Sequence, residues 1–173
     1  MDVEEAILRR RAVRSFEDRE VPKEKLEEIM NSVRMAPSAS NKQDWKFVIV
    51  MDDEKKEEVY RAANKQSFVK EASAVIAGIT TDPEYRMSCG IPSGVVDLSI
   101  AMDHLTLKAA EEGLGTCWIG AFDQEKAKDV LEVPDEYEIV ALMPIGYPKT
   151  SLEKRSKNRA EAREIVSYNT FSE

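Results

Sequence analysis

The feature that most limits the possible folds is a long apolar helix in the second half of the chain. Residues 93–115, SGVVDLSIAMDHLTLKAAEEGLG, repeat apolar side chains at a helical period, and Gly113 is placed to end the helix. Val96, Ile100 and Leu107 fall on other faces of the same helix. A helix that is apolar nearly all round is typical of the centre of a protein, so we expect this one to be buried among other elements.

Runs of β-prone apolar residues lie on both sides of this helix. Buried strands are predicted at 45–52, 72–82 and 137–148, with a shorter β-prone segment at 116–122. Further helices are predicted at 2–9, 22–36, 53–64 and 123–133. This alternation indicates helices on both faces of a sheet, but it leaves α/β and α+β folds open. No repeat or linker interrupts the pattern, so we expect one domain over residues 1–173.

The formal charge of −8 disfavours contact with the phosphate backbone of nucleic acids. No apolar run approaches the ~20 residues needed to cross a bilayer. The N-terminus, MDVEEAIL, is acidic where a signal peptide is basic. We therefore expect a cytoplasmic protein with no nucleic-acid or membrane partner. Cys89 and Cys117 are expected to be free thiols, and no Cys/His spacing suggests a metal site.

Four arginines, Arg9, Arg10, Arg11 and Arg14, lie close together in this acidic chain. One interpretation is a solvated helix end, because cations are mildly favourable near a helix C-terminus. The other is an anion site, because a guanidinium group offers a planar fork to phosphate oxygens and stays charged when partly buried. The residues alone leave both interpretations open. A small phosphomonoester is the kind of ligand whose charge several arginines would neutralise.

Three more stretches are candidates for ligand contact, and each also has a purely structural interpretation. The segment 36–47, APSASNKQDWKF, is either a plain turn or a loop that hydrogen-bonds a flat polar ligand. The segment 113–122, GLGTCWIGAF, is either a helix stop with a core strand or a place where backbone approaches a ligand at Gly120. Its glycines do not form a GxGxxG fingerprint. The motif KNR, residues 157–159, is on its own a charged chain end.

No protein acid, base or nucleophile accompanies these stretches, so any redox chemistry would belong to a cofactor. In this order, the stretches resemble the nitroreductase-like family of FMN-dependent oxidoreductases. The similar blocks span nearly the whole chain and are RRAVRSF, APSASNKQDWKF, VVDLSIAMDHLTLKAAEEGLGTCWIGAF, IVALMPIGYP and KNRAEAREIVSYN.

The resemblance implies an α+β, three-layer fold in which a mixed central sheet is flanked by helices. It also implies an intertwined homodimer with exchanged C-terminal tails, here residues 149–173, and two FMN sites at the subunit interface. The tail ends in EIVSYNTF, whose apolar residues have no obvious place in the first 150 residues. A partner subunit would supply that place.

The resemblance also assigns residues to the cofactor. It implies that the FMN phosphate and ribityl chain contact Arg10, Arg11, Arg14 and the backbone of Ala12, with Lys157 and Arg159 added by the tail. It implies that the flavin meets, from the other subunit, Pro37, Ser38, Ser40, Asn41 and Gln43. It implies that the isoalloxazine ring lies against Trp118, Ile119, Gly120 and Ala121. No residue receives a catalytic role, because the chemistry belongs to N5 of the flavin.

Three departures from the family pattern affect these expectations. Ala12 stands where serine is usual, so one hydroxyl contact is missing while the backbone N–H remains. Asp44 stands where proline is usual, which predicts a looser turn before Trp45. The chain is also short for the family, and we expect it to lack the helical insertion that covers the substrate in larger members.

The function that the resemblance implies is a two-electron transfer. NADH or NADPH delivers hydride to FMN and departs, and a small acceptor then takes the electrons at the same site, which gives ping-pong kinetics. Candidate acceptors are nitroaromatics, quinones and free flavins. Two alternatives stay open: a different reaction on the same fold, either reductive dehalogenation or flavin fragmentation, and a non-catalytic protein that binds or stores FMN.

Overall fold

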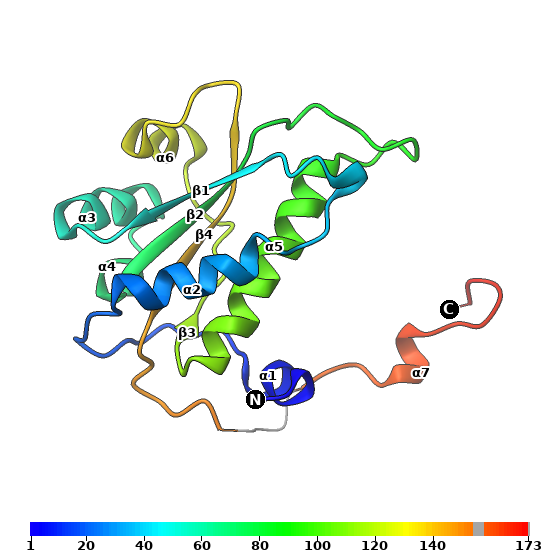
Figure 1. Cartoon of the computed structure of the whole chain (residues 1–173), viewed down its shortest axis with the longest axis horizontal. Helices are drawn as coiled ribbons and strands as arrows, with labels where there is room; N and C mark the ends of the chain where they lie inside the picture. Colours follow the sequence, from blue (N-terminus) through cyan, green and yellow to red (C-terminus); the bar gives the residue numbers. More distant parts are fainter. Residues whose placement is uncertain (154–157, 173) are drawn as a thin grey trace.

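A four-stranded sheet forms the centre of the molecule (Figure 1). The computed structural model describes residues 1–153 and 158–172. Across the sheet the strands run in the order β1 (Trp45–Val50), β2 (Ala74–Thr80), β4 (Glu138–Gly146) and β3 (Gly115–Thr116). The helices are α1 (Val3–Arg9), α2 (Lys23–Val33), α3 (Asp53–Ala62), α4 (Phe68–Glu71), α5 (Ser93–Glu111), α6 (Gln124–Leu131) and α7 (Ala162–Ile165), with one 3-10 turn, η1 (Ala39–Asn41).

Helices cover both faces of this sheet, so the fold has the three layers that were predicted (Figure 1). The central strand β2 supplies both cores. Ala74 and Ile76 pack with α2 and α5 on one face. Val75 and Ala77 pack with α3, α4 and α6 on the other. Because both faces are covered, β2 is buried at every residue, which explains why its sequence is a continuous apolar run.

Every pairing between the four strands is antiparallel. The fold is therefore α+β, which the sequence pattern alone left undecided. The sheet is less mixed than the resemblance implied. Within the described residues of this single chain, the parallel component is the bridge between Ala12 and Thr116.

The long helix α5 is central but is not buried all round, so that part of the prediction is wrong for the single chain. Leu98 and Met102 are fully buried against the sheet and α2. Val95 is 41 % exposed, and Val96 and Ile100 are exposed on a neighbouring face. One apolar stripe of the helix therefore lies open to solvent.

The predicted end of α5 is confirmed. Gly113 has a φ of +76°, a backbone conformation that glycine adopts without strain. Its N–H donates to the Ala110 carbonyl at 3.2 Å, and the N–H of Leu114 donates to the Ala109 carbonyl at 2.7 Å. These two bonds make a Schellman motif, which satisfies the last carbonyls of the helix.

The start of α5 lies so close to β2 that only glycine fits at position 94. A methyl group on Gly94 would lie 2.1 Å from Thr80 Oγ1 and 3.1 Å from the Asp82 carbonyl oxygen. Gly94→Ala is therefore expected to lower the free energy of unfolding by about 1–3 kcal/mol, the usual cost of overpacking. Chemical denaturation measures this change. The matched control is Gly120→Ala, where an added methyl group meets nothing within 4 Å and the expected change is within about 0.5 kcal/mol. Equal stabilities for the two variants would contradict the close approach.

Candidate functional site

The first basic block and the segment after α5 lie side by side. Ala12 pairs with Thr116, and the N–H of Val13 donates to the Thr116 carbonyl at 2.8 Å. Two stretches separated by a hundred residues of sequence are thus joined at the outer strand of the sheet, β3. This juxtaposition brings together two of the predicted cofactor-binding segments.

The arginines of this block have different surroundings. Arg9 pairs with Glu5 within α1, which favours the helix-end interpretation, while its Nε is buried without a hydrogen-bond partner among the described residues. Arg11 is half-buried and its Nη1 donates to the Glu153 carbonyl at 3.3 Å. Its Nη2 is buried and has no hydrogen-bond partner within the part of the chain that the structure describes. A buried guanidinium N–H without a partner costs free energy, and an anion beside it would remove that cost.

Arg14 is the exposed member of the block. Its guanidinium carbon lies 5.9 Å from the centre of the Phe68 ring, on α4. Burial raises the pKa of the Cys117 thiol, while the positive charge of Arg14 acts in the opposite direction. The charge of Arg14 therefore acts on Cys117, the first residue after β3. Arg10, between Arg9 and Arg11 in the sequence, is half-buried and makes an interaction of its own.

Both cysteines are free thiols, as predicted. Cys89 is exposed in the loop before α5, and Cys117 is buried beneath the candidate site. Because its pKa is raised, Cys117 stays protonated near neutral pH and is a packing residue.

The segment 118–121 presents an open strip of backbone. Ile119 exchanges two hydrogen bonds with Leu142 of β4, at 2.9 and 3.1 Å. Backbone groups alternate in direction along an extended chain, so those of Trp118 and Gly120 point away from β4. Trp118 is 42 % exposed, and the space above Gly120 is open. A flat ligand can therefore approach this backbone closely.

Two polar residues beside this strip were not predicted from the sequence. Asn64 Nδ2 and Gln66 Nε2 donate to the Ala121 carbonyl at 3.0 and 3.1 Å. They belong to the turn after α3, in which Asn64 and Lys65 have positive φ. The polar run after a helix is a recognisable stop signal, but its contact with residue 121 is tertiary and leaves no local pattern.

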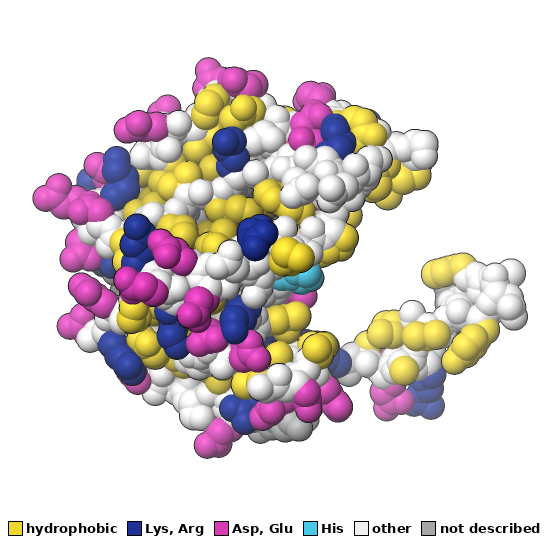
Figure 2. Space-filling model, in the orientation of Figure 1, with side chains coloured by type: hydrophobic (Ala, Val, Ile, Leu, Met, Phe, Trp, Pro, Cys, Tyr) yellow, Lys and Arg dark blue, Asp and Glu magenta, His cyan; other side chains and the backbone are white. Residues whose placement is uncertain are grey.

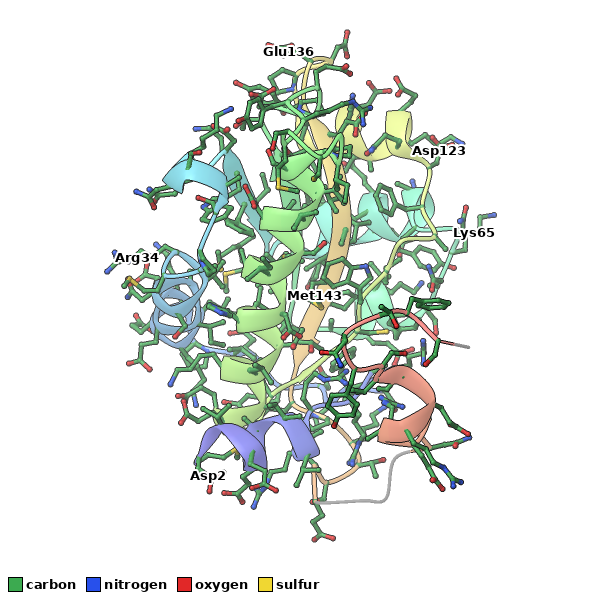
Figure 3. All side chains as sticks on the ribbon, turned by 90° about the vertical axis from the view of Figure 1, so that its right-hand side faces the viewer. Asp2, Arg34, Lys65, Asp123, Glu136 and Met143 are labelled. Atoms are coloured by element: carbon green, nitrogen blue, oxygen red, sulfur yellow. The ribbon has the colours of Figure 1, made fainter. Side chains whose placement is uncertain are left out.

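The remaining predicted cofactor-binding segment, residues 36–47, lies at the end of α5 that is opposite to β3 (Figure 3). Ser38 is a turn former, as expected, and its Oγ accepts from the Gln43 N–H at 3.0 Å. The N–H of Ala39 donates to the Asp97 carboxylate near the start of α5. A helix rises about 1.5 Å per residue, so about 20 Å separates Asp97 from the end of α5 that leads to β3. One chain therefore does not bring Pro37–Gln43 to its own arginine block.

The C-terminal tail is exposed over residues 158–172 (Figure 2), whereas Leu152 near its start is buried in the core of its own chain. The exposed large apolar side chains on it are Ile165, Val166, Tyr168 and Phe171. Arg159 is exposed and donates to its neighbour's carbonyl at 2.7 Å, and no contact with the arginine block is present among the described residues. Lys157 lies outside the described residues.

The departures from the family pattern have local explanations. Asp44 has two contacts at its turn: its carboxylate pairs with Lys42 at 3.1 Å and its carbonyl accepts from the Thr81 N–H at 3.1 Å. Ala12 is exposed and retains its backbone pairing with Thr116. Between β2 and α5, residues 81–92 form a loop without helix. Along residues 1–153 and 158–172, no helix is both long and apolar enough for a membrane span.

Comparison with known proteins identifies the family of this chain. The Nitroreductase family model matches residues 7–90 and 84–147. A putative NADH dehydrogenase/NAD(P)H nitroreductase of Methanothermobacter thermautotrophicus is 32% identical over 152 residues, which is 86% of this chain and 78% of that protein.

Two crystal structures are similar over nearly their full length. A nitroreductase family protein of Clostridium difficile 630 is 30% identical, with a TM-score of 0.87, over 99% of this chain and 100% of that one. An FMN-dependent nitroreductase of Clostridium difficile R20291 is 30% identical, with a TM-score of 0.81, over 96% of this chain and 99% of that one. The chain belongs to the nitroreductase family of oxidoreductases.

Proposed function

We propose that this protein is an FMN-dependent oxidoreductase that takes electrons from NADH or NADPH and passes them to a small organic acceptor. The observation that carries the proposal is the pairing of Ala12 and Val13, within the arginine block, with Thr116, which lies just before the open backbone strip at 118–121. FMN has the two matching parts, an anionic phosphate and a flat ring. When bound, FMN supplies a two-electron carrier that serves donor and acceptor in turn, which gives ping-pong kinetics.

Each side of the site has a separate task. The guanidinium groups of Arg11 and Arg14 bind the phosphate, and the unpartnered Nη2 of Arg11 gains an acceptor. The backbone of Trp118 and Gly120 positions the ring and offers N–H groups to its polar edge. Asn64 and Gln66 hold this strip through the Ala121 carbonyl. The relative that is named as an FMN-dependent nitroreductase supports the same choice of cofactor.

The proposed assembly is a homodimer in which tails are exchanged. Three observations support it: the open apolar stripe of α5, the exposed apolar tail, and the distance between the two ends of α5. A second subunit would bring its loop Pro37–Gln43 to the flavin and its Arg159 to the phosphate. The dimer thus explains how segments that are separated in one chain belong to one site.

Anaerobic reduction and reoxidation test this function. The purified protein is expected to be yellow, or to become yellow on titration with FMN, and to be bleached by NADH or NADPH. An acceptor panel of a nitroaromatic, a quinone, free riboflavin and iodotyrosine then reports the reaction. Rapid recovery of colour with the first three supports the proposal, while recovery with iodotyrosine alone would indicate the dehalogenase. A colourless protein that takes up no FMN would refute the proposal, and bleached protein that no acceptor reoxidises would indicate a storage protein.

A further inference from the structure

The loop between η1 and β1 has an unusual backbone. Ser40, Asn41 and Gln43 have φ values of 52°, 56° and 55°, all in the left-handed region that non-glycine residues rarely adopt. Each such residue costs free energy and persists only where its surroundings hold it. Three of them within four positions need strong fixed contacts.

One of those contacts comes from a buried carboxylate. Asp97 is 6 % exposed and lies in the second turn of α5. Its Oδ2 accepts the N–H of Ala39, the first residue of η1, at 3.0 Å. A charged acceptor in a buried place makes a stronger hydrogen bond than a neutral one. This bond ties the beginning of the loop to the long central helix α5.

A second clamp holds the other side of the loop. Lys42 Nζ lies 3.1 Å from the Asp44 carboxylate and 3.0 Å from that of Asp82, and 3.5 Å from the centre of the Tyr85 ring. The Lys42 side chain is 30% exposed, so solvent screens these ion pairs. The part-buried bond to Asp97, whose residue is 6 % exposed, is screened less, so its loss is expected to affect the loop most.

We propose that Asp97 is a positioning residue for the flavin ring. It acts through Ala39, because it fixes the backbone that carries Ser40, Asn41 and Gln43, the side chains expected to meet the flavin of the partner subunit. The inference rests on the proposed function. Since the loop is expected to contact the flavin ring and not the phosphate, Asp97 contributes equally to the binding of FMN and of riboflavin.

Flavin titration of the full-length protein tests the inference. Asp97→Ala is expected to weaken the binding of FMN and riboflavin by the same factor, about tenfold, the size of one hydrogen bond to a charged group. The visible circular dichroism of the bound flavin is expected to change as well, because the ring environment changes. Asp97→Asn keeps an oxygen acceptor and is expected to restore both affinities to within about threefold of the wild type.

Two further variants separate positioning from stability. Asp52→Ala removes a carboxylate that accepts the Lys55 N–H at 2.8 Å at the start of α3. It is expected to lower the melting temperature and to leave both flavin affinities unchanged. Ala39→Pro removes the donor while leaving Asp97 in place, and proline suits the first position of a helical turn. Ala39→Pro is expected to show the losses of flavin affinity and the change in dichroism that are predicted for Asp97→Ala. It therefore tests the same contact if Asp97→Ala folds poorly.

The outcomes distinguish this inference from the proposed function. Wild-type protein that binds neither flavin would overturn both. Wild-type protein that binds flavin, with Asp97→Ala and Ala39→Pro that retain wild-type affinities and dichroism, would overturn the positioning role alone. A loss confined to FMN would also overturn it, since that pattern belongs to a phosphate contact.

Discussion

Replacing Arg14 with methionine is expected to weaken FMN binding about 10- to 150-fold. The reason is the loss of a charged hydrogen bond to the phosphate, which contributes about 1.5–3 kcal/mol. Methionine keeps an unbranched apolar side chain that can still pack near Phe68, 5.9 Å from the guanidinium group in the wild type. Riboflavin has no phosphate, so its affinity is expected to stay within about twofold of the wild type.

Calorimetric titration with the two flavins measures this difference. Arg19→Met is the matched control, because Arg19 stacks on Tyr147 at 3.7 Å and lies outside the block of Arg10, Arg11 and Arg14. It is expected to leave both affinities unchanged. Equal losses of FMN and riboflavin in Arg14→Met would show that Arg14 supports the ring or the fold and does not bind the phosphate.

Much of the fold was predictable because its signals are local. Each of the three long predicted strands contains an observed strand, at 45–50, 74–80 and 138–146. The inner strands β2 and β4 have nearly continuous apolar runs because helices cover both faces of the sheet, whereas the edge strand β1 is only partly buried. Asp123, where the helix over 123–133 was predicted to begin, caps α6 by accepting the Lys126 N–H at 3.2 Å. The helices α4 and α7 were missed, because four residues are too few to show a helical period.

The candidate site was less predictable, because its parts meet through tertiary contacts. The arginine block looked uniform in sequence, yet Arg9 pairs with Glu5 and Arg11 donates to the Glu153 carbonyl. Each of the two also has a buried nitrogen without a hydrogen-bond partner in the described structure, Nε of Arg9 and Nη2 of Arg11. The pairing of Arg9 could have been read from its spacing of four from Glu5. The contacts of Asn64 and Gln66 with residue 121 could not, since each looks like ordinary turn chemistry.

The exposed apolar stripe of α5 was also not predictable from local sequence. Sequence periodicity reports that a helix face is apolar, and it does not say whether the same chain covers that face. Val95 and Ile100 satisfy the pattern of a buried helix while remaining exposed. An apolar surface left open in this way is typical of an interaction surface.

A chain that ends at Glu153 is expected to be monomeric and to bind flavin much more weakly. The removed tail carries Arg159 and four exposed apolar side chains, each exposed by 49 % or more. Burying such side chains stabilises an assembly by about 1.5–3 kcal/mol each. The full-length protein is therefore expected to sediment as a dimer and the shortened chain as a monomer. FMN and riboflavin affinities are both expected to fall at least about 100-fold, because the partner's loop no longer reaches the ring.

Full-length Arg159→Met separates the charge of the tail from its role in assembly. It is expected to sediment as a dimer, to bind riboflavin like the wild type, and to bind FMN about tenfold more weakly or worse. Sedimentation equilibrium and flavin titration on the same samples give both readouts. A shortened chain that stays dimeric would remove the tail from the interface. A monomeric shortened chain with wild-type FMN affinity would mean that one subunit forms the whole site, and the basic groups at the two ends of the chain would then serve different purposes.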